Sequence, residues 1–222
     1  MVSKNEEYLI HGTQWENAIR ILQMKKILAN PPKKYKTFLA EWKPTKQIFT
    51  QLIYKDIPNQ EQYNPGWGGV WIVLSKQLLK DYPFYATGIG GFLNNFEDAF
   101  NADNDKIGND EIKGKIKGII IKGEGNLDKI PNLTKLKNHI KKGFDFMHSH
   151  EILFGNDIPL EKYCVAVIAN FYTDDNENRE MEKLCGELNI PYTRMEKKER
   201  KDRFKPYGLN KFLGLVDGLV SG

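Results

Sequence analysis

The chain has 222 residues, and its 33 basic and 29 acidic side chains give a formal charge of +4 at pH 7. This length is sufficient for one domain with a substantial core, and the 40% apolar and 12% aromatic content exclude a disordered chain. No apolar run reaches the roughly 18 residues that a membrane-spanning helix requires, and residues 1–7 lack the apolar stretch of a secretory signal. We therefore expect a single domain spanning residues 1–222, in the cytoplasm or nucleus and without a membrane partner.

The N-terminal part of the chain predicts a strand, a turn and a helix in that order. Residues 8–10 form a short apolar run, and the tripeptide His11-Gly12-Thr13 follows it as a turn. Apolar residues then recur at helical spacing over residues 13–27, where Thr13 and Glu16 form the pattern of a capping box. Unpaired backbone amides at the start of a helix bind polar ligands, so this junction is the first candidate site.

The remainder of the chain alternates between predicted strands and helices. Runs of β-branched, aromatic and other apolar residues predict strands at 70–74, 115–121, 152–154, 163–169 and 190–192. Helical spacing is found at 48–53, at 76–82 after Ser75 as a cap, at 127–142 and at 174–188. Elements in this order indicate an α/β (α+β) composition, with helices packed around β-sheets.

Glu151 and two tyrosines are the second set of candidates. Glu151 stands directly before the strand at 152–154, where a strand side chain can point into a cleft. A single carboxylate in such a place orients a ribose hydroxyl or stabilises positive charge on a sugar as a glycosidic bond breaks. Tyr82 and Tyr85 each combine a ring that stacks on a flat heterocycle with a hydroxyl that forms hydrogen bonds. Taken singly, each of these residues also has a plain structural interpretation, as an edge carboxylate or a core tyrosine.

His148 and His150 raise a metal-binding alternative. Alternate residues of a strand share a face, so His-x-His is a spacing found among metal ligands. No second ligand pair accompanies it in the sequence, so a metal-dependent hydrolase ranks below the other interpretations and we predict no metal site. Cys164 and Cys185 have no histidine close in sequence and, without a secretory signal, indicate reduced core thiols.

Taken together, the two motifs resemble those of the ADP-ribosyltransferase superfamily of the His-Tyr-Glu type, which includes diphtheria-like toxins and poly-ADP-ribose polymerases. Residues 8–28 are similar to that family's strand-His-Gly-Thr-helix start. Residues 150–159 resemble the stretch that holds the catalytic glutamate in the DNA-modifying toxin branch. There a Glu–apolar strand, a turn, an Ile/Val-Pro step and another apolar strand follow in order. The resemblance touches roughly half of the chain and implies a split sheet of two packed, mainly antiparallel β-sheets with surrounding helices.

The resemblance implies NAD as the co-substrate and a role for each candidate. Within the motif His11-Gly12-Thr13, His11 would contact a ribose hydroxyl of NAD, and the Gly12 backbone would hold the nicotinamide amide. Tyr85, with Tyr82 as the second choice, would stack on the nicotinamide ring. Glu151 would hydrogen-bond the nicotinamide-ribose 2′-hydroxyl and stabilise the oxocarbenium-like transition state. An acceptor would then attack the anomeric carbon as nicotinamide leaves.

The expected function is therefore that of an NAD-dependent mono-ADP-ribosyltransferase with a macromolecular acceptor. The main alternative is a catalytically inactive module that binds nucleotide or nucleic acid on the same fold. An RNA 2′-phosphotransferase on this fold needs several arginines around its cleft, whereas four of the five arginines here lie at or beyond Arg179.

The positive charge of the chain is concentrated in one segment. Residues 192–207 hold seven basic and three acidic side chains, and the rest of the chain is neutral. Tyr192, Phe204 and Tyr207 lie among these charges, so the segment combines groups that meet phosphates with rings that stack on bases. A solvated surface is the plain alternative. We expect an acceptor protein or nucleic acid to contact this basic C-terminal segment through Arg194, Lys197, Lys198, Arg200, Lys201 and Arg203.

Overall fold

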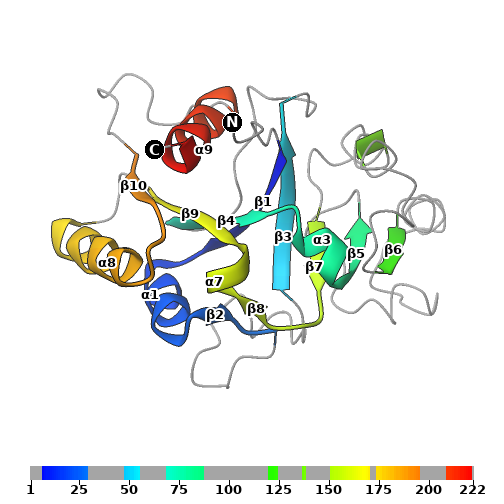
Figure 1. The fold of residues 1–222 in the computed structure, drawn as a ribbon, viewed down its shortest axis with the longest axis horizontal. Helices are drawn as coiled ribbons and strands as arrows, with labels where there is room; N and C mark the ends of the chain where they lie inside the picture. Colours follow the sequence, from blue (N-terminus) through cyan, green and yellow to red (C-terminus); the bar gives the residue numbers. More distant parts are fainter. Residues whose placement is uncertain are drawn as a thin grey trace, which may run out of the picture. The chain divides into compact units, whose positions relative to one another are not determined.

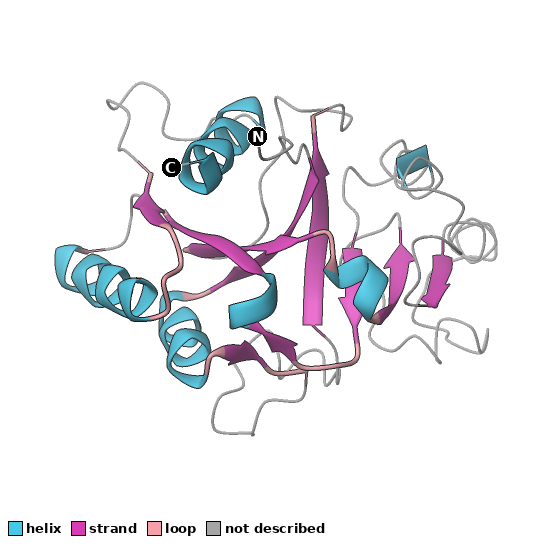
Figure 2. Cartoon of the chain, viewed as in Figure 1, coloured by secondary structure: helices cyan, strands magenta, loops and turns pink. Residues whose placement is uncertain are grey.

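The computed structural model describes residues 7–29, 48–55, 69–87, 120–124, 137–138, 151–170, 174–195 and 209–221. These residues form a mixed α/β structure (Figures 1 and 2). The chain divides into two compact units, the first comprising residues 1–27, 50–78 and 158–222 and the second comprising residues 28–49 and 79–157. The polypeptide therefore passes from one unit to the other four times. The expectation of a single domain remains a prediction.

The first unit is built on a mixed β-sheet. Its strands are β1 (Glu7–Thr13), β3 (Ile48–Tyr54, of which residues 50–54 belong to this unit), β4 (Val70–Ser75), β9 (Cys164–Ala169) and β10 (Tyr192–Arg194). They lie in the order β10-β9-β4-β1-β3. Neighbours are antiparallel except for β9 and β10, which are parallel.

Helices cover both faces of this sheet. Figure 1 shows α1 (Trp15–Met24) and α8 (Asp175–Glu187) on one side of the sheet and α9 (Leu209–Ser221) on the other. Consecutive strand residues are accordingly buried on both faces: residues 8–10 of β1 are at most 2% exposed, and residues 70–74 of β4 are at most 3% exposed. The core of the first unit is thus the central part of its sheet.

The C-terminal helix α9 packs on a defined face of β1 and β4. The ring of Phe212 meets the indole of Trp71 edge-on, with 5.9 Å between the ring centroids. The Tyr8 hydroxyl donates a hydrogen bond of 3.0 Å to Oδ1 of Asp217. Gly12 pairs with Trp71 across the two strands, so Tyr8, Gly12 and Trp71 share the face that α9 covers.

Helix α8 has a local start signal and a narrow buried stripe. The side chain of Asp174 accepts hydrogen bonds of 2.8 Å from the backbone N–H groups of Asn176 and Glu177, and Glu177 accepts one from the Asp174 N–H, which completes a capping box. Met181 and Cys185 are fully buried, whereas most other side chains of the helix are exposed. The amphipathic helix predicted over 174–188 is confirmed.

A two-stranded sheet follows α1. Helix α1 ends at Met24, short of the predicted residue 27, because Lys25 adopts a left-handed conformation with a φ of 57°. The chain then enters β2 (Lys26–Ile27), which pairs antiparallel with β8 (Ile158–Pro159). Helix α7 (Leu160–Tyr163) follows, and its first N–H donates to the Lys25 carbonyl at 2.9 Å.

The described part of the second unit also contains antiparallel strands. These are β5 (Pro83–Thr87), β6 (Ile120–Glu124) and β7 (Glu151–Phe154), in the order β7-β5-β6. The rings of Phe84 and Phe154, which are directly opposite each other, lie 6.0 Å apart. Phe84 and Phe154 therefore pack together on one face of the β5–β7 pair, and the residues that alternate with them lie on the other face.

The N-terminal motif differs from its prediction. His11-Gly12-Thr13, predicted as a turn, is the last part of β1, because the pairing with β4 continues as far as Thr13 opposite Val70. Thr13 is also not the helix cap: α1 begins at Trp15, and its N-cap is Gln14, which makes no side-chain capping bond. Burial of Thr13 in the sheet explains the difference.

The prediction of a helix over 48–53 is wrong, because these residues belong to β3. Leu52 pairs with Leu9 of β1, and Leu52, Ile53 and Tyr54 are all buried. A strand covered on both faces does not alternate apolar and polar residues, so its spacing imitated a helix. Pairing with β1 makes these residues a strand, which their local spacing alone does not indicate.

Other predictions can be compared element by element. The strands expected at 70–74, 152–154 and 163–169 are confirmed as β4, β7 and β9, and β10 begins at the end of the run 190–192. Ser75 ends β4 and its hydroxyl accepts from the Gln77 N–H at 3.2 Å, while helix α3 covers only Leu78–Asp81.

Two expected elements lie largely outside the described residues. Strand β6 covers the end of the run 115–121, and of the helix expected over 127–142 only residues 137–138, which are helical, are described. The α/β composition is confirmed, whereas the split sheet stays a prediction. Within the described ranges, no helix is long and apolar enough to cross a membrane.

Candidate functional site

The first motif, His11-Gly12-Thr13, lies in the part of β1 that follows the end of its pairing with β3. Pairing with β4 continues to Thr13, but in the part of the chain that the structure describes, pairing with β3 ends at Ile10 opposite Gln51. The backbone of His11, Gly12 and Thr13 therefore extends beyond the β1–β3 ladder. Strand-edge N–H and C=O groups are strong donors and acceptors. His11 and Gly12 are partly exposed, so a ligand can reach this end of β1.

The second motif is organised by the register of β5 and β7. Glu151 is opposite Thr87 and Tyr85 is opposite Leu153. Cross-strand partners share a face, as do alternate residues of one strand, so Glu151 and Tyr85 occupy the same face. The Cα atoms of such diagonal neighbours typically lie roughly 7 to 8 Å apart. Tyr82 precedes β5 and is not on this strand face, so the register favours Tyr85 as the partner of Glu151.

The structure thus groups the candidate residues into two sets. His11, Gly12 and Thr13 are consecutive residues of β1 in the first unit, while Tyr85 and Glu151 share a strand face in the second unit. The residues of the metal alternative, His148 and His150, lie outside the described residues. Across the described ranges, no group of three His, Cys, Asp or Glu side chains is arranged to bind a metal ion.

The two cysteines are free thiols in the first unit. Cys185 is fully buried, and burial raises its pKa from 9.0 to about 12. The pKa of Cys164 is raised as well, first by burial and then by the nearby Cys185. Neither group is a thiolate at neutral pH, and the thiolate is the form that attacks electrophiles. A structural role agrees with this protonation state.

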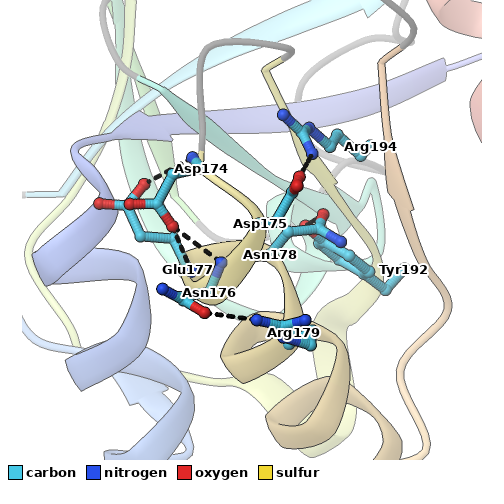
Figure 3. Close-up of polar contacts among 8 residues, drawn as sticks. All are labelled: Asp174, Asp175, Asn176, Glu177, Asn178, Arg179, Tyr192 and Arg194. Carbon is cyan, nitrogen blue, oxygen red and sulfur yellow. Dashed lines mark hydrogen bonds and ion pairs between the residues drawn. The ribbon is translucent and has the colours of Figure 1, made fainter.

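The start of the basic C-terminal segment is tied to α8 (Figure 3). Arg194 forms an ion pair with Asp175, with 2.7 Å between Nη1 and Oδ1, and the Tyr192 hydroxyl donates to Oδ1 of Asn178 at 2.8 Å. Burial raises the pKa of Tyr192. Nucleic-acid contact at Arg194 would therefore compete with an existing ion pair. The other residues predicted to touch an acceptor, Lys197, Lys198, Arg200, Lys201 and Arg203, lie outside the described residues.

One buried polar group was missed by the sequence reasoning. Trp71 is 3% exposed, and its indole Nε1 has no hydrogen-bond partner among the described residues. The sequence shows Trp71 only as part of an apolar strand, and no local pattern reveals that its N–H is unpaired. Its cross-strand partner is Gly12, so the unpaired donor lies beside the first motif.

Comparisons with protein-family models, with curated proteins and with solved structures found no match to this chain. The case for a function accordingly rests on the residues and their geometry.

Proposed function

We propose that the protein is an NAD-dependent mono-ADP-ribosyltransferase, which transfers ADP-ribose from NAD to a macromolecular acceptor and releases nicotinamide. The observation that carries the proposal is the placement of both motifs on strands, with His11, Gly12 and Thr13 ending β1 and Glu151 beginning β7 next to β5. The resemblance of the two motifs supplies the reaction class.

A strand edge of this kind complements a primary carboxamide. The N–H and C=O of one strand residue point to the same side, so together they bind the oxygen and the NH₂ of an amide. We assign this contact to the backbone of Gly12, which is partly exposed. Gly12 has no side chain to hinder a ligand that approaches the backbone closely. Nicotinamide carries such an amide.

The shared face of β5 and β7 supports the chemical roles assigned to Tyr85 and Glu151. A tyrosine ring on that face stacks on the nicotinamide ring, and the neighbouring carboxylate accepts a hydrogen bond from the nicotinamide-ribose 2′-hydroxyl. The bond between C1′ and the nicotinamide nitrogen breaks with its electron pair going to nicotinamide. The carboxylate stabilises the positive charge that develops on the ribose. An oxygen or nitrogen of the acceptor then bonds to C1′ and loses its proton.

The test is incubation with labelled NAD and a panel of protein, DNA and RNA acceptors. Glu151→Gln keeps the size of the side chain and removes its charge, so we expect transfer and NAD hydrolysis to fall about 100-fold or more. Glu161→Gln is the matched control, because Glu161 is an exposed carboxylate of α7. Circular dichroism checks that both variants fold. Full turnover of NAD by Glu151→Gln would contradict the proposal.

A further inference from the structure

The unpaired indole N–H of Trp71 indicates a binding group. An indole nitrogen only donates hydrogen bonds, and a buried donor without a partner destabilises the protein that carries it. Such groups are rare in native structures, and each needs an explanation, of which a bound ligand is one. Phe212 packs edge-on against the ring and holds it in place. Trp71 is thus a fixed donor with no acceptor among the described residues.

Two positions without side chains flank this donor. Gly12 is opposite Trp71 on β1, and Gly69 is two residues before Trp71, directly before the start of β4. A Cβ atom added at Gly69 would meet no other atom within 4 Å, so there is open space beside this position. Asn170 is beside Gly69, since its N–H donates to the Gly69 carbonyl at 2.7 Å. We call Gly12, Gly69, Trp71 and Asn170 the indole patch.

The composition of the indole patch selects an uncharged ligand. None of its four residues carries a charge, and burying an unpaired ionic group beside an indole would be costly. Trp71 supplies a donor, and the amide side chain of Asn170 contains both an acceptor and a donor. This combination complements a group with a carbonyl oxygen and an N–H, as in a primary carboxamide. Because Gly12 also belongs to the β1 edge, no side chain at this position separates that edge from the indole.

We infer that Trp71 is a ligand-binding residue whose indole N–H donates to the carbonyl oxygen of a primary carboxamide. This inference rests on the proposed function insofar as the carboxamide is that of nicotinamide, free or as part of NAD. The uncharged indole patch as a whole, rather than Trp71 alone, sets the preference for the amide over the carboxylate, because a carboxylate brings a charge into it and has no N–H.

Calorimetric titration with nicotinamide, nicotinate and NAD tests the inference on the intact chain. Trp71→Phe keeps an aromatic ring and removes the donor, and we expect about tenfold weaker binding of nicotinamide and NAD, the effect of one lost hydrogen bond. Gly69→Ala places a methyl group in the open space, so it should weaken binding without disturbing the fold. Wild-type protein should bind nicotinate more weakly than nicotinamide.

Lys211→Ala is the control, since it changes an exposed side chain of the same helix and leaves the indole and its packing against Phe212 in place, so its affinity should stay close to that of the wild type. The inference is overturned if Trp71→Phe and Gly69→Ala bind nicotinamide as tightly as the wild type, if Lys211→Ala loses as much affinity as Trp71→Phe, or if the wild type binds no nicotinamide. A wild type that binds nicotinamide through Trp71 but never turns over NAD would refute the proposed reaction and leave the carboxamide site standing. If Trp71→Phe instead turns over NAD and binds nicotinamide as tightly as the wild type, the carboxamide site is refuted and the proposed reaction is left standing.

Discussion

Helices α8 and α9 have the same length, 13 residues, but the first unit holds them by opposite kinds of contact. The N-terminal half of α8 is bound by polar groups, most of them exposed: its cap, the ion pair with Arg194 and the partly buried hydrogen bond from Tyr192 (Figure 3). Helix α9 is bound by buried apolar residues, Phe212, Leu213 and Val216, with one hydrogen bond from Tyr8.

This difference shows that the number of polar contacts a helix makes is a poor guide to how much the helix contributes to stability. Asp175 is 85% exposed in its ion pair with Arg194, and pairs of this kind contribute about 0 to 1 kcal/mol. A buried aromatic side chain contributes several times more, because its removal loses transfer free energy and leaves a cavity. We therefore expect the first unit to depend more on α9 than on the polar contacts of α8.

The largest effect is expected for Phe212→Ala. The side chain is fully buried against Trp71, so its truncation should lower the free energy of unfolding by about 3 to 5 kcal/mol, measured by urea denaturation. Leu219→Ala, at a half-buried position of the same helix, is the control and should cost clearly less. A loss below about 1 kcal/mol in Phe212→Ala would reverse the ranking of the two helices.

An intermediate effect on the free energy of unfolding is expected at alkaline pH, and it comes from Cys185 in the buried stripe of α8. The pKa of Cys185 is 9.0 when unperturbed and is raised to about 12 in the folded protein. The folded state therefore holds this proton more tightly, and the stability it provides is complete below pH 9 and is lost as the pH rises toward 12. The slope reaches about 1.4 kcal/mol per pH unit for one group.

Urea denaturation between pH 8 and 11, with reductant present, measures this slope. Cys185→Ala should flatten the decline relative to the wild type, although Cys164 and Tyr8, whose pKa values are also raised, leave part of it in place. Identical slopes for both proteins would show that the Cys185 thiol does not contribute.

The smallest effect is expected for the cap of α8. Asp174→Ala removes the acceptor of two backbone N–H groups and should lower the free energy of unfolding by about 1 kcal/mol. Asp175→Asn is the companion variant: it breaks the ion pair with Arg194, and its smaller effect should disappear in high salt. If Asp174→Ala proves as damaging as Phe212→Ala, the polar end of α8 matters more than its exposure indicates.

Local signals predicted those elements whose structure is decided locally. Helix α8 carries its capping box and its apolar stripe in one stretch of sequence, and β4, β7 and β9 are compact runs of strand-forming residues. Helix α9 was not predicted, although its apolar residues hold it on the sheet. Strand β3 and the end of β1 were mispredicted because their structure depends on pairing with residues far away in the chain.

The candidate site divides in the same way. The sequence identified His11-Gly12-Thr13 and Glu151 as motifs, but only the strand registers reveal where the pairing of β1 with β3 ends and which face Glu151 and Tyr85 share. The resemblance already made Tyr85 the first choice, and the bounds of β5 add that Tyr85 lies on this strand whereas Tyr82 precedes it. An unpaired donor such as that of Trp71 is a property of its surroundings in space, so no sequence pattern contains it.

The hydrogen bond between Tyr8 and Asp217 can form only late in synthesis of the chain. The two residues are 209 positions apart, and ribosomes add about 5 to 20 residues per second. Strand β1 therefore exists for roughly 10 to 40 s before the helix that covers it has been synthesised. Until α9 is made, the Tyr8 hydroxyl lacks its acceptor, and the Trp71 ring, once synthesised, lacks its contact with Phe212.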